Sequence, residues 1–310
     1  MADTLTIREK TAHAFVPGHI TGLFRIHDGH ENPFYRGSTG AGFSVSVGTK
    51  TSVTITEHPT LEAEIEYNEQ KIDGQITRTV VKRLSEIYEM PFKAKVIHQS
   101  SLPIGVGFGA SGAGALGTSL AICNIIDSDL TNNEIAKHAH YSEVINHAGL
   151  GDVIAQTVGG LEIRTHPGAP GIGKVMNVNY PQSIRVVLAG ATGLDTKDVL
   201  TDPVSRDKIN KAGDSLVSKL IANPTLDHFI ECSRTFANIT GLMTDRVKSA
   251  LRNLDESGFN RSSMVMLGDS VFCFCKTDSI SNVTSILSQF WDESEILTTS
   301  ISKVGGGLIE

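Results

Sequence analysis

The spacing of hydrophobic residues along the chain predicts strands first and helices later. Alternating apolar and polar residues dominate about the first 55 positions, as in residues 43–47, and alternation returns in residues 93–99, which is typical of strands. The glycine-rich stretch 37–42 predicts a flexible turn within this part. Residues 75–89 instead place apolar side chains at helical spacing. The N-terminal part should therefore be strand-rich, with one helix inserted.

The middle of the chain predicts two helices followed by a strand. Residues 113–126 are small or aliphatic on every side, so this helix should be buried. Thr131 and Glu134 form a capping box that starts a second helix, which should run to about His147. A strand is predicted at residues 161–165.

The second half combines helices with a few strands. A strand is predicted at 183–189 and amphipathic helices near 204–222, 225–238 and 243–256, and then strand, strand, helix and strand complete the chain. Because strands and helices do not alternate regularly, the fold class is predicted as α+β. A length of 310 residues suggests two domains, which we place at residues 1–178 and 179–310.

Composition narrows the function classes. The chain has 27 Lys plus Arg against 34 Asp plus Glu, a net charge of −7, which argues against a nucleic acid as partner. Apolar stretches such as 120–126 are far shorter than the ~20 residues of a membrane span, and no secretory signal is evident, so a cytoplasmic location without membrane contact is expected. The four cysteines follow no metal or disulfide spacing and should be reduced and structural. The oligomeric state stays open, a homodimer included.

The strongest chemical signal is a glycine loop, residues 102–114, that leads into the helix of small residues. Glycines let backbone N–H groups approach and surround an anion, and the positive end of the following helix is directed at it. The loop therefore predicts a phosphate site. The alternative is that its glycines and alanines only permit close packing of a buried helix.

Other motifs of this kind fail in their context. Residues 107–112 match a dinucleotide fingerprint, but a second helix follows in place of the strand that such a site needs. Ser111 lacks the second flanking glycine of a hydrolase nucleophile elbow. Residues 168–175 fit a phosphate loop except that Val175 replaces the hydroxyl needed for magnesium. Residues 304–308 are predicted to form a turn at the chain end.

Candidate acids, bases and metal ligands lie on the second helix and just after it. His140, Glu143 and His147 fall on one helical face, and Asp152 comes shortly after it. Two histidines seven residues apart are about 10 Å apart on a helix, which is awkward for one zinc ion. One carboxylate plus a hydroxyl suits magnesium, so Glu143 with Ser111 is a candidate pair. The alternative for Glu143 is a solvated helix face.

The order of these segments resembles that of the GHMP small-molecule kinases. The resemblance rests on residues 14–19, the loop 103–114, Glu143 and the stretch 151–160. It implies a two-domain α+β fold, with an N-terminal half like ribosomal protein S5 and a ferredoxin-like C-terminal half around a cleft. The superfamily's third glycine motif would fall near residues 263–270, where only one glycine is present.

The resemblance also assigns roles to residues and implies ATP and Mg²⁺ as cofactors. The triphosphate would lie on the loop, the metal on Ser111 and Glu143, and Asp152 would accept the proton of the substrate hydroxyl. Phosphoryl transfer needs mainly positioning and charge neutralisation, which these groups can supply. The residues expected to bind the nucleotide are Pro103, Gly105, Gly107, Gly109, Ala110, Ser111 and Gly112.

Three segments resemble more narrowly the archaeal pantoate kinases within that superfamily. They are residues 17–22, 40–43 and 159–168. They imply ATP-dependent phosphorylation of pantoate to 4-phosphopantoate in coenzyme A synthesis. Open alternatives are a kinase for another small hydroxy acid, such as homoserine or a mevalonate-like compound, a dinucleotide-dependent oxidoreductase, and a nucleotide-binding protein without turnover.

The acceptor's carboxylate calls for a cation. Arg164 is the candidate because its planar fork matches a carboxylate, although an exposed pair with Glu162 is the alternative. His140 and Ser38 are further candidates for substrate contact. His19 stands where many GHMP kinases carry Lys, so cationic help from this position would depend on pH.

Overall fold

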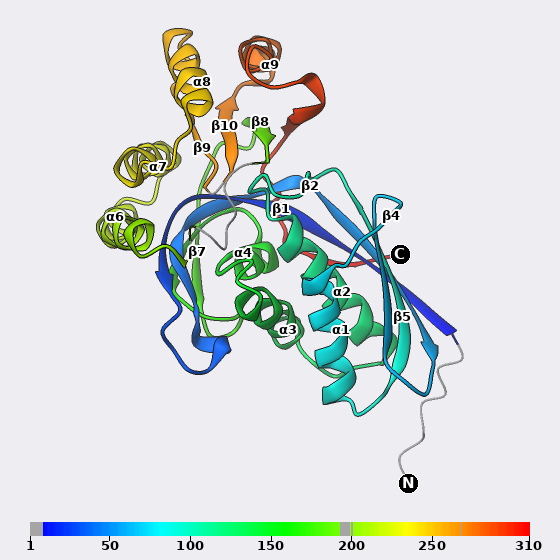
Figure 1. The fold of residues 1–310 in the computed structure, drawn as a ribbon. Helices are drawn as coiled ribbons and strands as arrows, with labels where there is room; N and C mark the ends of the chain where they lie inside the picture. Colours follow the sequence, from blue (N-terminus) through cyan, green and yellow to red (C-terminus); the bar gives the residue numbers. More distant parts are fainter. Residues whose placement is uncertain (1–8, 193–198, 200, 267) are drawn as a thin grey trace.

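The chain forms two β-sheets with helices packed around them (Figure 1). The computed structural model describes residues 9–192, 199, 201–266 and 268–310. The strands are β1 (Glu9–His27), β2 (Gly37–Glu57), β3 (Glu62–Tyr67), β4 (Gln70–Lys71), β5 (Phe92–Ser100), β6 (Leu161–His166), β7 (Lys174–Val178), β8 (Arg185–Ala191), β9 (Ser262–Met264), β10 (Asp269–Cys275), β11 (Ile296–Thr299) and β12 (Gly307–Ile309). The helices are α1 (Gln75–Ile87), α2 (Ala110–Ile125), α3 (Asn132–Ile145), α4 (Asp152–Val158), α6 (Pro203–Ala222), α7 (Leu226–Thr240), α8 (Asp245–Glu256) and α9 (Ile280–Leu287).

The larger sheet is built on the long strands β1 and β2. Its order is β12-β1-β2-β5-β3-β4, with β6 paired to β2 and β7 paired to β6. Within it β2 changes partner along its length, from β6 at residues 40–43 to β5 at residues 49–57. All of these pairs are antiparallel except β3 with β5. Strands β5 and β6 thus pair with different parts of β2, and the chain segment that joins them carries the glycine loop.

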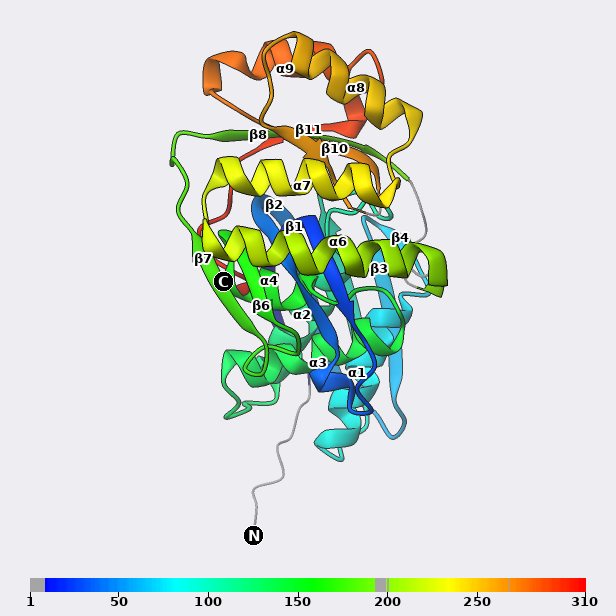
Figure 2. The same cartoon turned by 90° about the vertical axis from the view of Figure 1, so that its left-hand side faces the viewer.

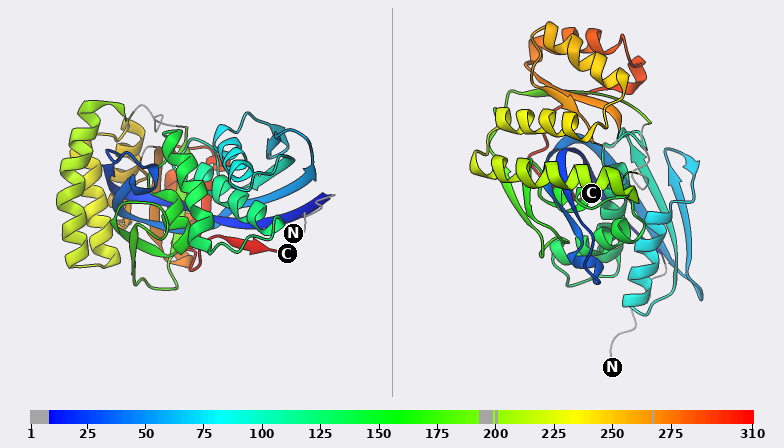
Figure 3. Two further views of the ribbon diagram at one scale, coloured as in Figure 1. Left: turned by 90° about the horizontal axis from the view of Figure 1, so that it is seen from below. Right: turned by 60° about the vertical axis from the view of Figure 1, so that its left-hand side comes forward.

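The helices form layers on both sides of this sheet. Helices α1 to α4 cover one face, and α2 packs on β1 and β2 (Figure 1). Helices α6 and α7 lie side by side across β1 on the other side (Figure 2). A view from below shows this helix pair stacked at one end of the molecule (Figure 3, left). The residues of the site described below therefore come from several different elements.

The smaller sheet, ordered β11-β8-β10-β9, is covered by α8 and α9 on its outer side (Figure 2). Its inner side faces β2, where Phe43 packs against Phe229, Phe272 and Phe274. One hydrophobic cluster therefore runs from the first half of the chain into the second. Strand β7, which ends at Val178, belongs to the larger sheet, and the next strand, β8, belongs to the smaller one.

Local sequence signals explain where the helices begin. The capping box at Thr131 is present at the start of α3, and the side chains of Asp202, Thr225 and Thr244 cap α6, α7 and α8. The predicted helices are confirmed, with ends that differ by up to three residues. Residues of α2 are buried on nearly every side, as its composition predicted.

Two local predictions are wrong. Residues 37–42 belong to strand β2 and do not form a flexible turn. Glycine is needed there because a Cβ on Gly42 would lie 2.6 Å from the His19 ring. The helix predicted to run to about His147 is confirmed: it ends at Ile145, and His147 adopts a left-handed φ of 55°. The end of the predicted terminal turn is strand β12, which pairs with β1.

Two other sequence predictions bear on the described part of the chain. Cys123, Cys232, Cys273 and Cys275 are all free and buried, as expected for structural thiols. None of the helices in the described ranges is long and apolar enough to cross a membrane.

Candidate active site

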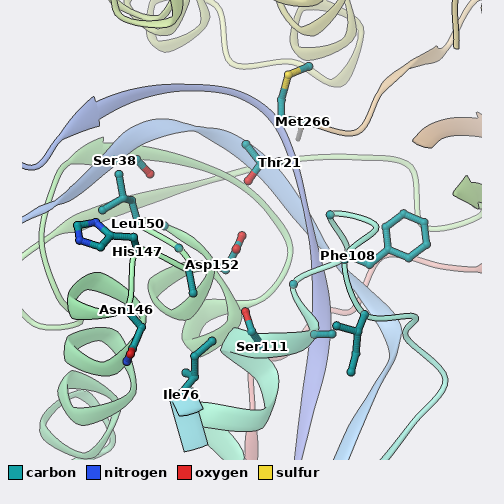
Figure 4. Close-up of a pocket in the computed structure, with 18 of the residues that line it drawn as sticks. Thr21, Ser38, Ile76, Phe108, Ser111, Asn146, His147, Leu150, Asp152 and Met266 are labelled. Atoms are coloured by element: carbon teal, nitrogen blue, oxygen red, sulfur yellow. The ribbon is translucent and has the colours of Figure 1, made fainter. Parts of the chain in front are cut away.

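A cavity of about 550 Å³ lies where the glycine loop, the connection between α3 and α4, and strand β6 meet. Its volume is within the usual range for small-molecule sites. Ser111 and Asp152 reach into it from the starts of α2 and α4, and Thr21 and Met266 lie on its far side (Figure 4). Apolar side chains, Phe24, Ile76, Phe108 and Leu150 among them, line other parts of the wall.

The glycine loop has the backbone geometry of an anion site. Gly105, Gly107 and Gly109 all have left-handed φ values, between 71° and 82°, which residues with a Cβ rarely adopt. Gly109 is the N-cap of α2, whose 16 residues begin at Ala110. Turns of this kind point successive N–H groups to one side, and the helix adds the positive end of its dipole. The phosphate prediction therefore has a matching local structure.

Contacts from two other elements, α4 and β10, fix the loop. Nε2 of Gln156, on α4, donates to the carbonyl oxygens of Pro17 and Gly109 at 2.9 and 2.8 Å. The Ser270 hydroxyl donates to the Val106 carbonyl at 2.9 Å. The predicted third glycine motif, residues 263–270, thus packs against the loop, and its described residue Met266 lines the cavity.

Glu143 is a buried carboxylate without a hydrogen-bond partner for either oxygen. Burial and the nearby charge of Asp152 raise its pKa to about 8, and the Ser111 hydroxyl offsets this only in part. The solvated helix face is therefore excluded. Buried polar atoms are rarely left unpartnered, and a divalent cation would satisfy these oxygens. Glu143 and Ser111 thus fit the donor set of a magnesium site that keeps waters and phosphate oxygens as its other ligands.

Asp152 begins α4 and is held by His19. Nδ1 of His19 lies 2.7 Å from Oδ1 of Asp152. Burial alone would raise the pKa of Asp152, but the hydrogen bond and charge of His19, together with the charge of Arg164, hold it below the usual range. The carboxylate is therefore ionised at neutral pH, with part of its side chain open to the cavity.

Arg164 lines the cavity from strand β6 although only 1% of its surface is exposed. Its Nη1 donates to Oε1 of Glu162 at 2.5 Å, so the predicted pair exists but is buried, not exposed as expected. Its Nε has no partner. A Cβ on Gly151 would come within 2.8 Å of that Nε and would also collide with the Ser38 hydroxyl. Ser38, Gly151 and Arg164 therefore lie together in one corner of the cavity.

Four predicted residues, His19, Gly112, His140 and Glu143, do not line the cavity. His140 is a buried residue of α3 whose Nε2 lies 2.9 Å from the Arg36 carbonyl oxygen, and burial lowers its pKa to about 4. His19 lies behind the wall, where it contacts Asp152 and Arg164, both of which line the cavity. His147 does line the cavity, but from beyond the end of α3. In the described part of the chain no three His, Cys, Asp or Glu residues are grouped to hold a metal ion.

Sequence reasoning missed the parts played by Gln156 and Glu162. Nothing in the sequence distinguishes Gln156 from a solvated helix residue. Glu162 and Arg164 are two residues apart on a strand and so share one face, a signal that could have placed both carboxylate and guanidinium in the site. Thr21, Asn146 and Thr192 also line the cavity, and they belong to no recognisable motif.

The comparisons with known proteins agree with this geometry. Residues 75–160 match the family model for the GHMP kinases N terminal domain. The chain is 34% identical to a pantoate kinase of Thermococcus kodakarensis, over 92% of this chain and 95% of that protein. It is also 34% identical to a pantoate kinase of Methanocaldococcus jannaschii, over 88% and 96% of the two chains.

A solved structure extends the likeness to the whole fold. A phosphotransferase related to the coenzyme A biosynthesis pathway superposes with a TM-score of 0.86 at 30% identity, covering 97% of this chain and 99% of that one. The glycine loop is followed by helices α2 and α3, not by a helix and then the strand that a dinucleotide-binding site needs. The chain belongs to the GHMP kinase family and, within it, to the pantoate kinases.

Proposed function

We propose that this chain transfers the terminal phosphoryl group of ATP to the primary hydroxyl of pantoate, which gives ADP and 4-phosphopantoate for archaeal coenzyme A synthesis. The observation that carries the proposal is the presence, in one cavity, of the glycine loop, the ionised Asp152 and the buried guanidinium of Arg164. Pantoate has a carboxylate at one end and a primary hydroxyl at the other. The site offers a partner for each.

Arg164 would bind the carboxylate of pantoate. Its Nε lacks a partner, and a bidentate contact with a carboxylate would satisfy it. Ser38, in the same corner, would donate to or accept from a substrate oxygen. The apolar wall formed by Phe24, Ile76 and Leu150 suits the two methyl groups of pantoate, which homoserine lacks.

Asp152 would accept the proton of the attacking hydroxyl. Its Oδ1 is held by His19, so Oδ2 is left for the substrate. A carboxylate with a low pKa is a weak base, but phosphoryl transfer has a loose transition state in which the hydroxyl mainly needs orientation and a late proton acceptor. Orientation by Asp152 therefore matters as much as its basicity.

Glu143 and Ser111 would hold Mg²⁺ beside the triphosphate on the glycine loop. The metal, when bound, would neutralise charge on the transferred group.

The proposal also includes the division into an S5-like half, residues 1–178, and a ferredoxin-like half, residues 179–310. His140 is then a support for the Arg36 backbone more than a substrate ligand.

Product analysis tests this function. The purified protein is incubated with ATP, Mg²⁺ and pantoate, and the product is examined by ³¹P NMR without proton decoupling. A phosphate on the primary hydroxyl couples to two protons and gives a triplet, whereas one on the secondary hydroxyl gives a doublet. A triplet supports the proposal. A doublet, or no phosphoester at all, overturns it.

A further inference from the structure

Glu162 does not line the cavity, yet its carboxylate joins two groups of the proposed site. Its Oε1 accepts from Nη1 of Arg164 at 2.5 Å and lies 3.2 Å from Nε2 of His19. On the other side of the imidazole, Nδ1 contacts Asp152 at 2.7 Å. Arg164, Glu162, His19 and Asp152 therefore form one continuous network, which we term the charge network. It runs from the carboxylate-binding corner to the proton acceptor.

The geometry favours protonation of His19. Each ring nitrogen faces a carboxylate oxygen, and a neutral imidazole would turn an acceptor nitrogen towards one of them. The charged groups facing the ring are Asp152 from α4 and Glu162 and Arg164 from β6. Burial lowers the pKa of His19, but the charge of Glu162 and the bonds to both carboxylates raise it overall. Only the imidazolium form can donate to both carboxylates at once.

Glu162 separates two buried cations. Nη1 of Arg164 lies 3.4 Å from Nε2 of His19, a contact that places two positive groups side by side. The carboxylate of Glu162 contacts both, and the side chains of all three residues are almost fully buried. Without its charge the two cations would repel each other, and burial would favour the neutral imidazole.

Glu162 also determines which edge of Arg164 faces the cavity. It takes the Nη1 position, while Nε stays free of any protein partner. A guanidinium held at one nitrogen cannot swing away from the corner that it shares with Ser38. The carboxylate of Glu162 thus acts on Arg164 and on Asp152 at the same time, and on the second only through His19.

We propose that Glu162 is a positioning residue whose negative charge keeps His19 protonated and Arg164 in place, and so holds the two ends of the acceptor in register. This inference rests on the proposed function, because it assigns Arg164 to the substrate carboxylate and Asp152 to its hydroxyl. The substrate class that it favours is a small hydroxy acid whose carboxylate and reacting hydroxyl are a fixed distance apart.

Kinetics of Glu162→Gln test the proposal, because glutamine keeps the shape and removes the charge. We expect KM for pantoate to rise about 10-fold or more, as for loss of a buried charged hydrogen bond, while KM for ATP changes less than about twofold. The alkaline limb of the pH profile of kcat should move to lower pH, since His19 would lose its proton earlier. Glu162→Asp, which keeps the charge, should restore part of that limb. Asp255→Asn, which breaks the ion pair with Arg234 between α8 and α7, should change none of these.

An NMR titration of the His19 ring gives a readout that needs no substrate. The signal is assigned by its absence in His19→Gln. Its midpoint should lie above 6.5 in the wild-type protein and fall in Glu162→Gln. If Glu162→Gln does not fold, His19→Gln interrupts the same network and should give the same split between the two KM values.

The outcomes separate this inference from the proposed function. A wild-type protein that does not phosphorylate pantoate overturns the function, and the titration of His19 still tests the network. A Glu162→Gln protein with the wild-type pH profile and an unchanged His19 titration overturns the inference while the function stands. Equal increases in both KM values also overturn it, because they would indicate a general loss of structure.

Discussion

Nε2 of Gln156 donates to the carbonyl oxygen of Gly109, the residue that precedes the first turn of α2. The same nitrogen donates to the Pro17 carbonyl. One amide group thus ties the glycine loop to β1 and to α4, which carries Asp152 at its other end. The glycine loop and Asp152, the proposed proton acceptor, are therefore linked through one side chain.

Replacing Gln156 by methionine should weaken nucleotide binding. Gln156→Met keeps the length of the side chain but removes its hydrogen bonds to two carbonyl oxygens, a loss of about 1–3 kcal/mol. We expect KM for ATP to rise about 10-fold and KM for pantoate to change less. Steady-state kinetics with each substrate varied in turn provide the measurement. Gln182→Met, at an exposed glutamine, is the control, and equal behaviour of the two variants would contradict the role given to Gln156.

Replacing Asp152 by asparagine should remove the proton acceptor while keeping the shape of the site. We expect kcat to fall by about 100-fold or more, the usual scale for an acid–base group, with ATP binding preserved in a direct titration. Asp278→Asn, at an exposed residue far along the chain, should leave both unchanged. Normal turnover with weakened ATP binding in Asp152→Asn would instead assign Asp152 to the nucleotide or the metal.

Stability should depend on pH through Glu143. Its pKa is about 8 in the folded protein and about 4.5 when unfolded, so the folded state binds more protons between these values. The free energy of unfolding should therefore decrease as pH rises from 5 to 8. Relative to Glu143→Gln, the wild-type protein should lose about 2–4 kcal/mol over this range in the absence of Mg²⁺.

Denaturant unfolding of the two proteins at several pH values measures this difference. Mg²⁺ with a nucleotide should stabilise the wild-type protein at pH 8 more than Glu143→Gln, because the metal needs the ionised carboxylate. Parallel pH profiles of the two proteins would show that Glu143 is not the titrating group. Near wild-type turnover of Glu143→Gln at limiting Mg²⁺ would remove it from the metal site.

Replacing Arg164 by lysine should separate the two substrates. A point charge cannot reproduce a bidentate contact, so Arg164→Lys should raise KM for pantoate about 10-fold or more and change KM for ATP less than about twofold. Initial rates with purified protein are sufficient. Lys174, an exposed residue of the neighbouring strand β7, allows a matched control as Lys174→Arg. Equal effects of Arg164→Lys on both substrates would place Arg164 outside the acceptor site.

Local sequence patterns predicted most elements of the fold because their signals are local. The capping box at Thr131 and the small residues of α2 act within a few positions, and both were identified. The glycines among residues 37–42 led to the wrong prediction of a turn, because their role depends on a distant part of the chain. They let β2 lie close to β1. Strand β12 forms only because β1, almost 300 residues earlier, offers a free edge.

The residues of the candidate site likewise divide into those with a local sequence signal and those without one. The glycine loop, Ser111, Glu143, Asp152 and Arg164 stand in motifs, and the fold gathers them around one cavity, Glu143 buried just behind its wall. His140 looks equivalent to Glu143 on a helical wheel, yet it turns to the Arg36 carbonyl. Gln156 acquires its role only through contacts with residues more than 40 positions away, which no spacing rule can supply. Strand spacing could have placed Glu162 beside Arg164, but it could not supply the contact of Glu162 with His19.

A comparison of three phosphoryl acceptors tests whether the cavity binds pantoate. ADP release from ATP and Mg²⁺ is measured in a coupled assay with pantoate, homoserine or mevalonate as the acceptor and one preparation of the protein. We expect ADP to form with pantoate, and kcat/KM for the other two to be lower by at least about 100-fold. Comparable or faster turnover of homoserine or mevalonate, or no turnover of pantoate, would contradict this expectation.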